Sequence, residues 1–139
     1  MNSSLNEERG FVVPLVAVLS PVLIAILGLM IDFGIAASNY FKLANAVDAA
    51  AYAALDSYDE ALWEEEGVIE IEYSVARNKA LVYLHENLEE ATLREFQLLP
   101  NGKGVRVKAE VNSPVFFMKM FGIGDRTITS VAEAELKEP

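Results

Sequence analysis

The sequence contains no cysteine and only one histidine, His85. The absence of cysteine excludes disulfide bonds, thiolate nucleophiles and cysteine-ligated metal sites, and a lone histidine excludes metal sites built from histidine clusters. Basic residues are also scarce, since 11 Lys and Arg stand against 21 Asp and Glu and leave a net charge of −10. This balance argues against nucleic-acid binding, which requires a basic surface. Because no phosphate-binding loop, metal-ligand spacing or nucleophile motif is present, we expect neither catalysis nor a cofactor.

Apolar residues, in contrast, are abundant, and the longest uncharged run extends from Gly10 to Ile31. From Phe11 onward this run would form about 31 Å of helix, at ~1.5 Å per residue. That length matches the hydrocarbon core of a bilayer, which is about 30 Å thick. Pro14 and Pro21 lie within the run, where a membrane helix tolerates them as kinks. The sequence therefore predicts a single membrane-spanning helix in contact with lipid.

The helical pattern continues beyond the uncharged run, because the residues that follow are rich in alanine, the best helix former. We predict four parts: a short tail at residues 1–10, a transmembrane helix at 11–32, a helical stalk continuing it at 33–57, and a small head at 58–139. The alternative is a secretory signal cleaved near residues 36–38. The apolar region of such a signal is normally only about 7–15 residues long, which favours the membrane span.

Small residues recur along the predicted long helix, and such residues allow another helix to approach closely. They are Gly28, Gly34, Ser38, Ala46 and Ala50. Ala46, Ala50 and Ala54 form an alanine stripe on this helix. The stripe has two interpretations of equal weight, since it packs either against a partner helix or against the protein's own head. Asp32 lies at the end of the apolar segment. It either pairs with a neighbour and caps the span or is an interfacial charge that marks where lipid ends, and we favour the interfacial charge.

An acidic stretch from Asp56 to Glu72 contains eight acidic residues and no basic one. Like charges at this density favour a solvated surface, with weak cation binding as the alternative. The spacing of an EF-hand calcium loop is absent. Apolar residues at helical spacing then predict a second helix that begins at Ile71 or Ser74 and ends at about Glu95.

The last third of the chain alternates apolar and polar residues, as half-buried strands do. Residues 96–99, 105–111 and 127–136 fit three strands, with an Asn-Gly turn between the first two. We therefore predict an α+β fold, in which the second helix packs on a small antiparallel three-stranded sheet. A bulky apolar run from Val115 to Phe121 separates the last two strands. We expect it to pack in the core beneath the sheet, with a contact to another subunit as the alternative.

Several segments follow a known pattern along nearly the whole chain, apart from the acidic stretch. They are Glu8-Arg9-Gly10, Gly28-Leu29-Met30-Ile31-Asp32-Phe33-Gly34, Leu43-Ala44-Asn45-Ala46-Val47-Asp48-Ala49-Ala50-Ala51 and Pro114-Val115-Phe116-Phe117. A Phe-Gly turn and a last strand ending in Ala-Glu-Ala-Glu complete the pattern. Together these segments resemble the TadE/TadG-like proteins of Flp (tight-adherence) pilus assembly, nearest the TadG type.

The resemblance implies a non-catalytic, pilin-like, single-pass protein of the bacterial cell membrane, with its N-terminus in the cytoplasm and its head outside the cytoplasm. It implies a structural or minor component of a Tad/Flp-type pilus or related surface assembly. Its partners would be other pilin-like subunits or a membrane complex, met through the N-terminal helix. Some relatives are cut by a prepilin peptidase, and the candidate junction here is Gly10–Phe11. Leu15 stands fifth after that junction, where those relatives carry glutamate.

Two versions of the structural role stay open. One is a minor component that primes or caps a pilus, and the other is a subunit that polymerises itself or is an accessory chain in a larger membrane complex. A membrane-tethered binding module is the alternative from another functional class. The residues that we expect to act in membrane contact and helix packing are Phe11, Pro14, Pro21, Gly28, Asp32, Gly34, Ser38, Ala46 and Ala50.

Overall fold

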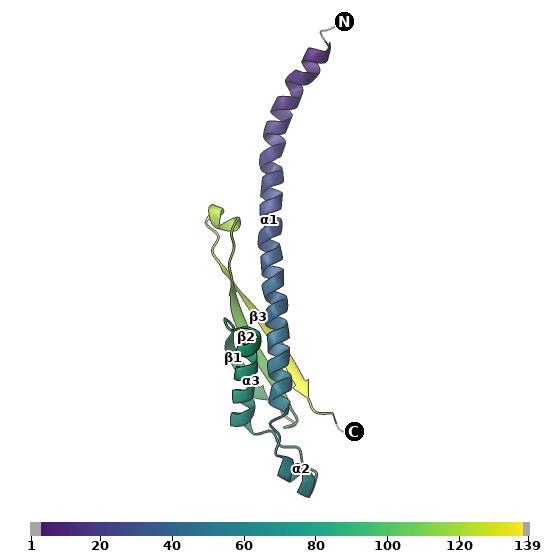
Figure 1. The fold of residues 1–139 in the computed structure, drawn as a ribbon, viewed down its shortest axis with the longest axis vertical. Helices are drawn as coiled ribbons and strands as arrows, with labels where there is room; N and C mark the ends of the chain where they lie inside the picture. The colour runs from purple at the N-terminus through teal and green to yellow at the C-terminus, as the bar shows by residue number, and fades with distance from the viewer. Residues whose placement is uncertain (1–3, 138–139) are drawn as a thin grey trace.

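The computed structural model describes residues 4–137, with side chains from residue 10 onward. The elements in chain order are α1 (Ser4–Leu55), α2 (Glu60–Glu66), α3 (Tyr73–Asn87), β1 (Thr92–Leu98), β2 (Gly104–Ser113), the 3-10 helix η1 (Met118–Phe121) and β3 (Arg126–Glu135). Figure 1 shows that the other elements gather along the C-terminal half of α1, while its N-terminal half projects alone. The predicted α+β class, with a long N-terminal helix and a small antiparallel sheet, is confirmed.

The long helix α1 continues without a break through Pro14 and Pro21. A proline removes one backbone hydrogen bond and bends a helix, and α1 curves gently in its N-terminal part (Figure 1). The hydroxyl of Ser20 donates a hydrogen bond to the carbonyl of Val16 at 2.7 Å, a contact that also favours bending. From Gly10 onward α1 is long and apolar enough to cross a membrane.

The sheet has the strand order β1-β2-β3, and both pairs are antiparallel. Its central register places Val107 of β2 between Phe96 of β1 and Ala132 of β3. Alternate residues of β2 are buried, because strand side chains point to opposite faces in turn. The buried face packs against the C-terminal half of α1, and α3 packs alongside α1 and β1.

Alanines form the contact between α1 and the rest of the head. Ala46, Ala50 and Ala54 of α1 have no exposed surface, and neither do Ala76 and Ala80 of α3. Side chains this small let the two helix backbones approach closely. Of the two interpretations of the alanine stripe, the structure shows the one in which it packs against the protein's own head.

The second helix is shorter than predicted, since α3 ends at Asn87 rather than near Glu95. Leu88 leaves helical geometry, and the chain has already entered β1 at Thr92. A register shift between Leu93 and Glu95 breaks the alternation of β1, which explains why the sequence did not reveal its first half.

The bulky run from Val115 to Phe121 is not in the core, so that prediction is wrong beyond Val115. Val115 itself is buried, but the side chains of Phe116, Met120 and Phe121 are 64%, 79% and 69% exposed. The physical reason is that β2 and β3 extend past the rest of the sheet, and their connection reaches the N-terminal side of the head instead of folding beneath it (Figure 1).

Candidate membrane and helix-packing site

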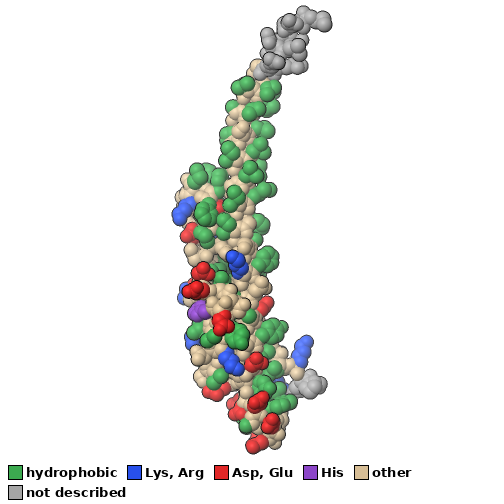
Figure 2. Space-filling model, viewed as in Figure 1, with side chains coloured by type: hydrophobic (Ala, Val, Ile, Leu, Met, Phe, Trp, Pro, Cys, Tyr) green, Lys and Arg blue, Asp and Glu red, His purple; other side chains and the backbone are tan. Residues whose placement is uncertain are grey.

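The N-terminal half of α1 exposes nearly all its apolar side chains. Figure 2 shows these hydrophobic side chains along the projecting part of the helix, whereas the charged ones gather on the head. Exposure begins at Phe11 and includes Pro14, Pro21 and most residues up to Ile31. Soluble monomers rarely expose a continuous apolar surface of this kind, so it marks contact with lipid or with other apolar helices.

One loop of the head reaches this exposed half, and we call residues 115–124 the tip loop. The ring of Phe117 lies directly against Gly28 of α1. A Cβ atom added at Gly28 would stand 2.2 Å from Cδ2 of Phe117, which is too close for any side chain. Gly28 therefore provides close packing, as its residue type suggested, but the packed group is a ring of the same chain.

Asp32 fastens the tip loop one helical turn further along α1. Its Oδ1 accepts hydrogen bonds from the backbone N–H groups of Phe116 at 2.8 Å and Phe117 at 3.1 Å. Its Oδ2 accepts one from the N–H of Met118 at 2.7 Å. The residue is only 3% exposed. Hydrogen bonds to an ionised acceptor are stronger than neutral ones, so Asp32 is a docking point for the tip loop, a contact that the sequence did not predict.

Four further polar residues hold the base of the tip loop. Asn39 of α1 donates from Nδ2 to the hydroxyl of Ser113 at 3.0 Å. Asp125 accepts from the N–H of Val115 at 3.3 Å and from Asn112 Nδ2 at 3.4 Å. Sequence reasoning missed these contacts. The one available signal was that Asn39 follows Asp32 by seven residues, which places both on the same face of the helix.

The other small residues of α1 divide between two environments. Ala46 and Ala50 are buried in the head, as described above. Gly34 and Ser38 are exposed, and a Cβ at Gly34 would meet nothing within 4 Å. At about 100° per residue, Gly34 lies about 160° and Ser38 about 120° around α1 from Asp32, so both face away from Asp32. The candidate junction between Gly10 and Phe11 lies inside the continuous helix, where Gly10 is also uncrowded.

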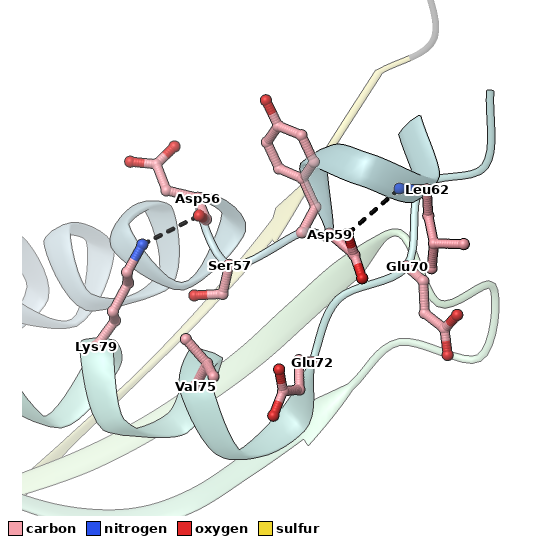
Figure 3. Close-up of a pocket in the computed structure, with 9 residues that line it drawn as sticks. Asp56, Ser57, Asp59, Leu62, Glu70, Glu72, Val75 and Lys79 are labelled. Carbon is pink, nitrogen blue, oxygen red and sulfur yellow. Dashed lines mark hydrogen bonds between the residues drawn. The ribbon is translucent and has the colours of Figure 1, made fainter. Parts of the chain in front are cut away.

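A second candidate site is a cleft of about 370 Å³ at the opposite end of the head. Figure 3 shows its carboxylates pointing in different directions: Asp56 away from Glu72, and Glu70 to the far side. Asp59 caps α2 through hydrogen bonds from the N–H groups of Ala61 and Leu62, and Lys79 donates to the carbonyl of Asp56. Among the described residues, no group of three or more acidic or histidine side chains is arranged to hold a metal ion. The acidic residues that line the cleft are exposed to solvent.

The similarity of the chain to a known protein family lies in the long helix α1. Residues 16–51 match the model of the TadE-like protein family. The TadE-like segment includes both docking positions, Gly28 and Asp32, and the buried alanines of the stalk. No curated protein and no solved structure matches the chain significantly. The match agrees with the resemblance seen in the sequence over residues 16–51, within a helix that is long and apolar enough to cross a membrane.

Proposed function

We propose that this protein is a non-catalytic, pilin-like component of a Tad/Flp-type pilus or related surface assembly. It spans the membrane once, with its N-terminus in the cytoplasm and its head on the outer side. It acts through packing of the N-terminal half of α1 against lipid and against other apolar helices. The proposal goes beyond the family match, which covers residues 16–51 only.

One observation carries this proposal. A single helix of 52 residues supplies the core of the head with its C-terminal half and leaves its N-terminal half exposed and apolar. A subunit of this form is anchored by a helix that remains available to neighbouring helices, while the folded head stays in water. An enzyme would need a pocket with converging reactive groups, and the described residues contain no such arrangement around the acidic cleft.

The face of α1 that carries Gly34 and Ser38 is the proposed contact with a neighbouring helix. Small residues four positions apart let two helices approach closely within a membrane or at its surface. The tip loop contacts α1 at Gly28 and Asp32 and leaves Gly34 and Ser38 exposed. Exposed Phe41 lies one turn beyond Ser38 and extends the same face.

Cysteine crosslinking tests the proposed contact, because the chain has no cysteine of its own. We expect Ser38→Cys in native membranes to form disulfide-linked dimers, or crosslinks to a pilus subunit, on mild oxidation. The matched control is Tyr52→Cys, which is exposed on the same helix but at the level of the head. Equal crosslinking at both positions would show that the face with Gly34 and Ser38 has no special role.

Intact-mass analysis tests the place of the protein in the assembly. Protein would be isolated separately from membranes and from material sheared off the cell surface. A chain that starts at Phe11 and is enriched in the sheared fraction means a processed subunit that enters a filament. A chain that retains the residues before Phe11 and stays in membranes means an anchored minor or accessory component. If the protein is absent from the sheared pilus fraction, and if deletion of its gene leaves piliation normal, a role in the pilus is contradicted.

A further inference from the structure

We propose that the tip loop is a second membrane contact, which inserts its apolar side chains into the lipid interface beside the spanning helix. The occupant of this surface is the bilayer itself. The proposal rests on membrane anchoring of α1 and does not depend on a role in a pilus. It therefore shares the membrane span with the proposed function, but it can fail while the proposed function holds.

The position of the loop is the first argument. Phe117 packs against Gly28, three residues before the uncharged run ends at Ile31. At ~1.5 Å per residue, that contact lies about 4.5 Å inside the end of the apolar segment. If the apolar segment matches the hydrocarbon core, the tip loop stands at the boundary between acyl chains and headgroups.

The side chains of the loop are the second argument. Phe116, Met120 and Phe121 are all exposed. Figure 2 shows hydrophobic side chains at the end of the head that lies beside the exposed part of α1. The only charged residue among residues 115–124 is Lys119, in a chain whose net charge is −10. Aromatic residues with a flanking lysine are typical of the membrane interface, where a lysine side chain reaches the anionic headgroups.

The backbone of the loop is the third argument, and it favours lipid over water. Peptide groups that enter an apolar phase must have hydrogen-bond partners within the protein. The N–H groups of residues 116–118 donate to Asp32, and that of Val115 donates to Asp125. Those of residues 120, 122 and 123 donate to carbonyls of the loop itself. The loop can therefore leave water with few unpaired backbone donors.

The same contacts explain how a carboxylate is tolerated at this depth. Asp32 follows directly on the apolar segment, and an unpaired charge there is unfavourable. Three backbone N–H groups surround its two oxygens, and the residue is almost completely buried. Asp32 and the tip loop thus satisfy each other's polar groups and present apolar side chains outward.

Depth-dependent fluorescence quenching tests this inference on the full chain. The only tryptophan, Trp63, lies in α2 at the far end of the head (Figure 1), so a Trp63→Phe background is silent. In that background, Phe121→Trp would be measured in vesicles of phosphatidylcholine and phosphatidylglycerol brominated near the top of the acyl chain. Leu29→Trp in the span is the positive control. Tyr52→Trp, exposed on the same helix beside the head, is the negative control.

We expect Phe121→Trp to be quenched roughly half as strongly as Leu29→Trp or more, with a blue-shifted emission, as an interfacial residue should be. Quenching as weak as that of Tyr52→Trp, together with free access for aqueous iodide, overturns the proposal. Quenching that disappears as protein density in the membrane rises, while that of Leu29→Trp persists, also overturns it, because a second copy then covers the loop. Met120→Trp repeats the measurement at the most exposed side chain of the loop, in case the first variant disturbs the fold.

Discussion

The two halves of α1 are both apolar and belong to one helix, yet their surroundings differ completely. From Phe11 to Ile31 the side chains are large and almost all exposed. From Leu43 to Leu55 the side chains that face the head are mostly alanines, and they are buried against α3 and the sheet. Hydrophobicity alone does not separate the halves, whereas side-chain size does. Large residues contact lipid, which adapts to any shape, and small residues contact a protein surface, which must fit closely.

The largest expected effect is in the buried half. Leu43 has no exposed surface, so Leu43→Ala leaves a cavity and should lower the free energy of unfolding of the head by about 2–5 kcal/mol. Leu29→Ala is the matched control in the exposed half and should leave the unfolding of the head unchanged. Thermal unfolding in detergent micelles, followed by near-UV circular dichroism, measures both. Similar losses in the two variants would contradict the division of α1 into two halves.

The next effect is at the border between the halves, where Gly28 meets Phe117. Gly28→Ala forces the ring of Phe117 to move, since the new Cβ would stand 2.2 Å from it, and overpacking of this kind typically destabilises by about 1–3 kcal/mol. Gly34→Ala adds the same methyl group in open space and should stabilise the helix slightly. The unfolding midpoints of the two variants should move in opposite directions. If both rise, Phe117 does not pack on Gly28.

A more local effect is expected when the hydrogen bonds between Asp32 and the backbone of residues 116–118, which we call the clasp, are weakened. Asp32→Asn removes the charge and turns one of the two acceptor oxygens into a donor, so one or more N–H groups of residues 116–118 lose their partner. Hydrogen exchange at these amides should accelerate on the order of tenfold. Asp48→Asn, at an exposed position of the same helix, is the control. Unchanged exchange at residues 116–118 would show that the carboxylate does not hold the loop.

The smallest effect concerns an ion pair between two strands of the sheet. Arg94 of β1 forms a hydrogen-bonded ion pair with Glu110 of β2. This hydrogen bond, and the attraction between the two charges, hold the pKa of Glu110 below its ordinary value. Its contribution to stability is therefore present above the ordinary glutamate pKa and is lost as the pH falls through the lowered one.

Urea unfolding of Glu110→Gln across the acidic pH range measures the contribution of this ion pair to stability. The variant should be slightly less stable than the original protein near neutral pH, and the difference should vanish at low pH. High salt should reduce it too, since exposed ion pairs are screened. Glu89→Gln, in the exposed turn after α3, should show no such difference. A pH-independent loss in Glu110→Gln would point to packing rather than charge.

Most of the fold could be predicted from local patterns in the sequence. The long helix and two of the strands follow from uncharged length, alanine content and alternation. The end of α3 did not follow, because Leu88 and Leu93 extend a helical spacing and the irregular start of β1 hides its alternation. The boundary there depends on pairing with β2, which a local pattern does not contain.

The sequence singled out two residues of the candidate site but not the contacts that they make. Gly28 and Asp32 stood out as a small residue and a charge next to the apolar segment. Their partners, Phe116 to Met118, lie more than 80 positions further along the chain. One carboxylate can accept hydrogen bonds from three N–H groups here because β2 and β3 extend past the rest of the sheet. The spacing of residues in the sequence does not reveal this extension. The same reason explains why Asn39 and Asp125 escaped notice.

The clasp at Asp32 has a mechanical consequence. The head holds α1 at two separate heights, by packing along residues 43–55 and by hydrogen bonds and ring contact at Gly28 and Asp32. A rod gripped at one point pivots there, whereas a rod gripped at two points resists bending between them. A sideways push on the far end of the head should therefore turn the helix and head together as one lever, and we expect bending in the part of α1 that the head does not hold, around Pro14 and Pro21.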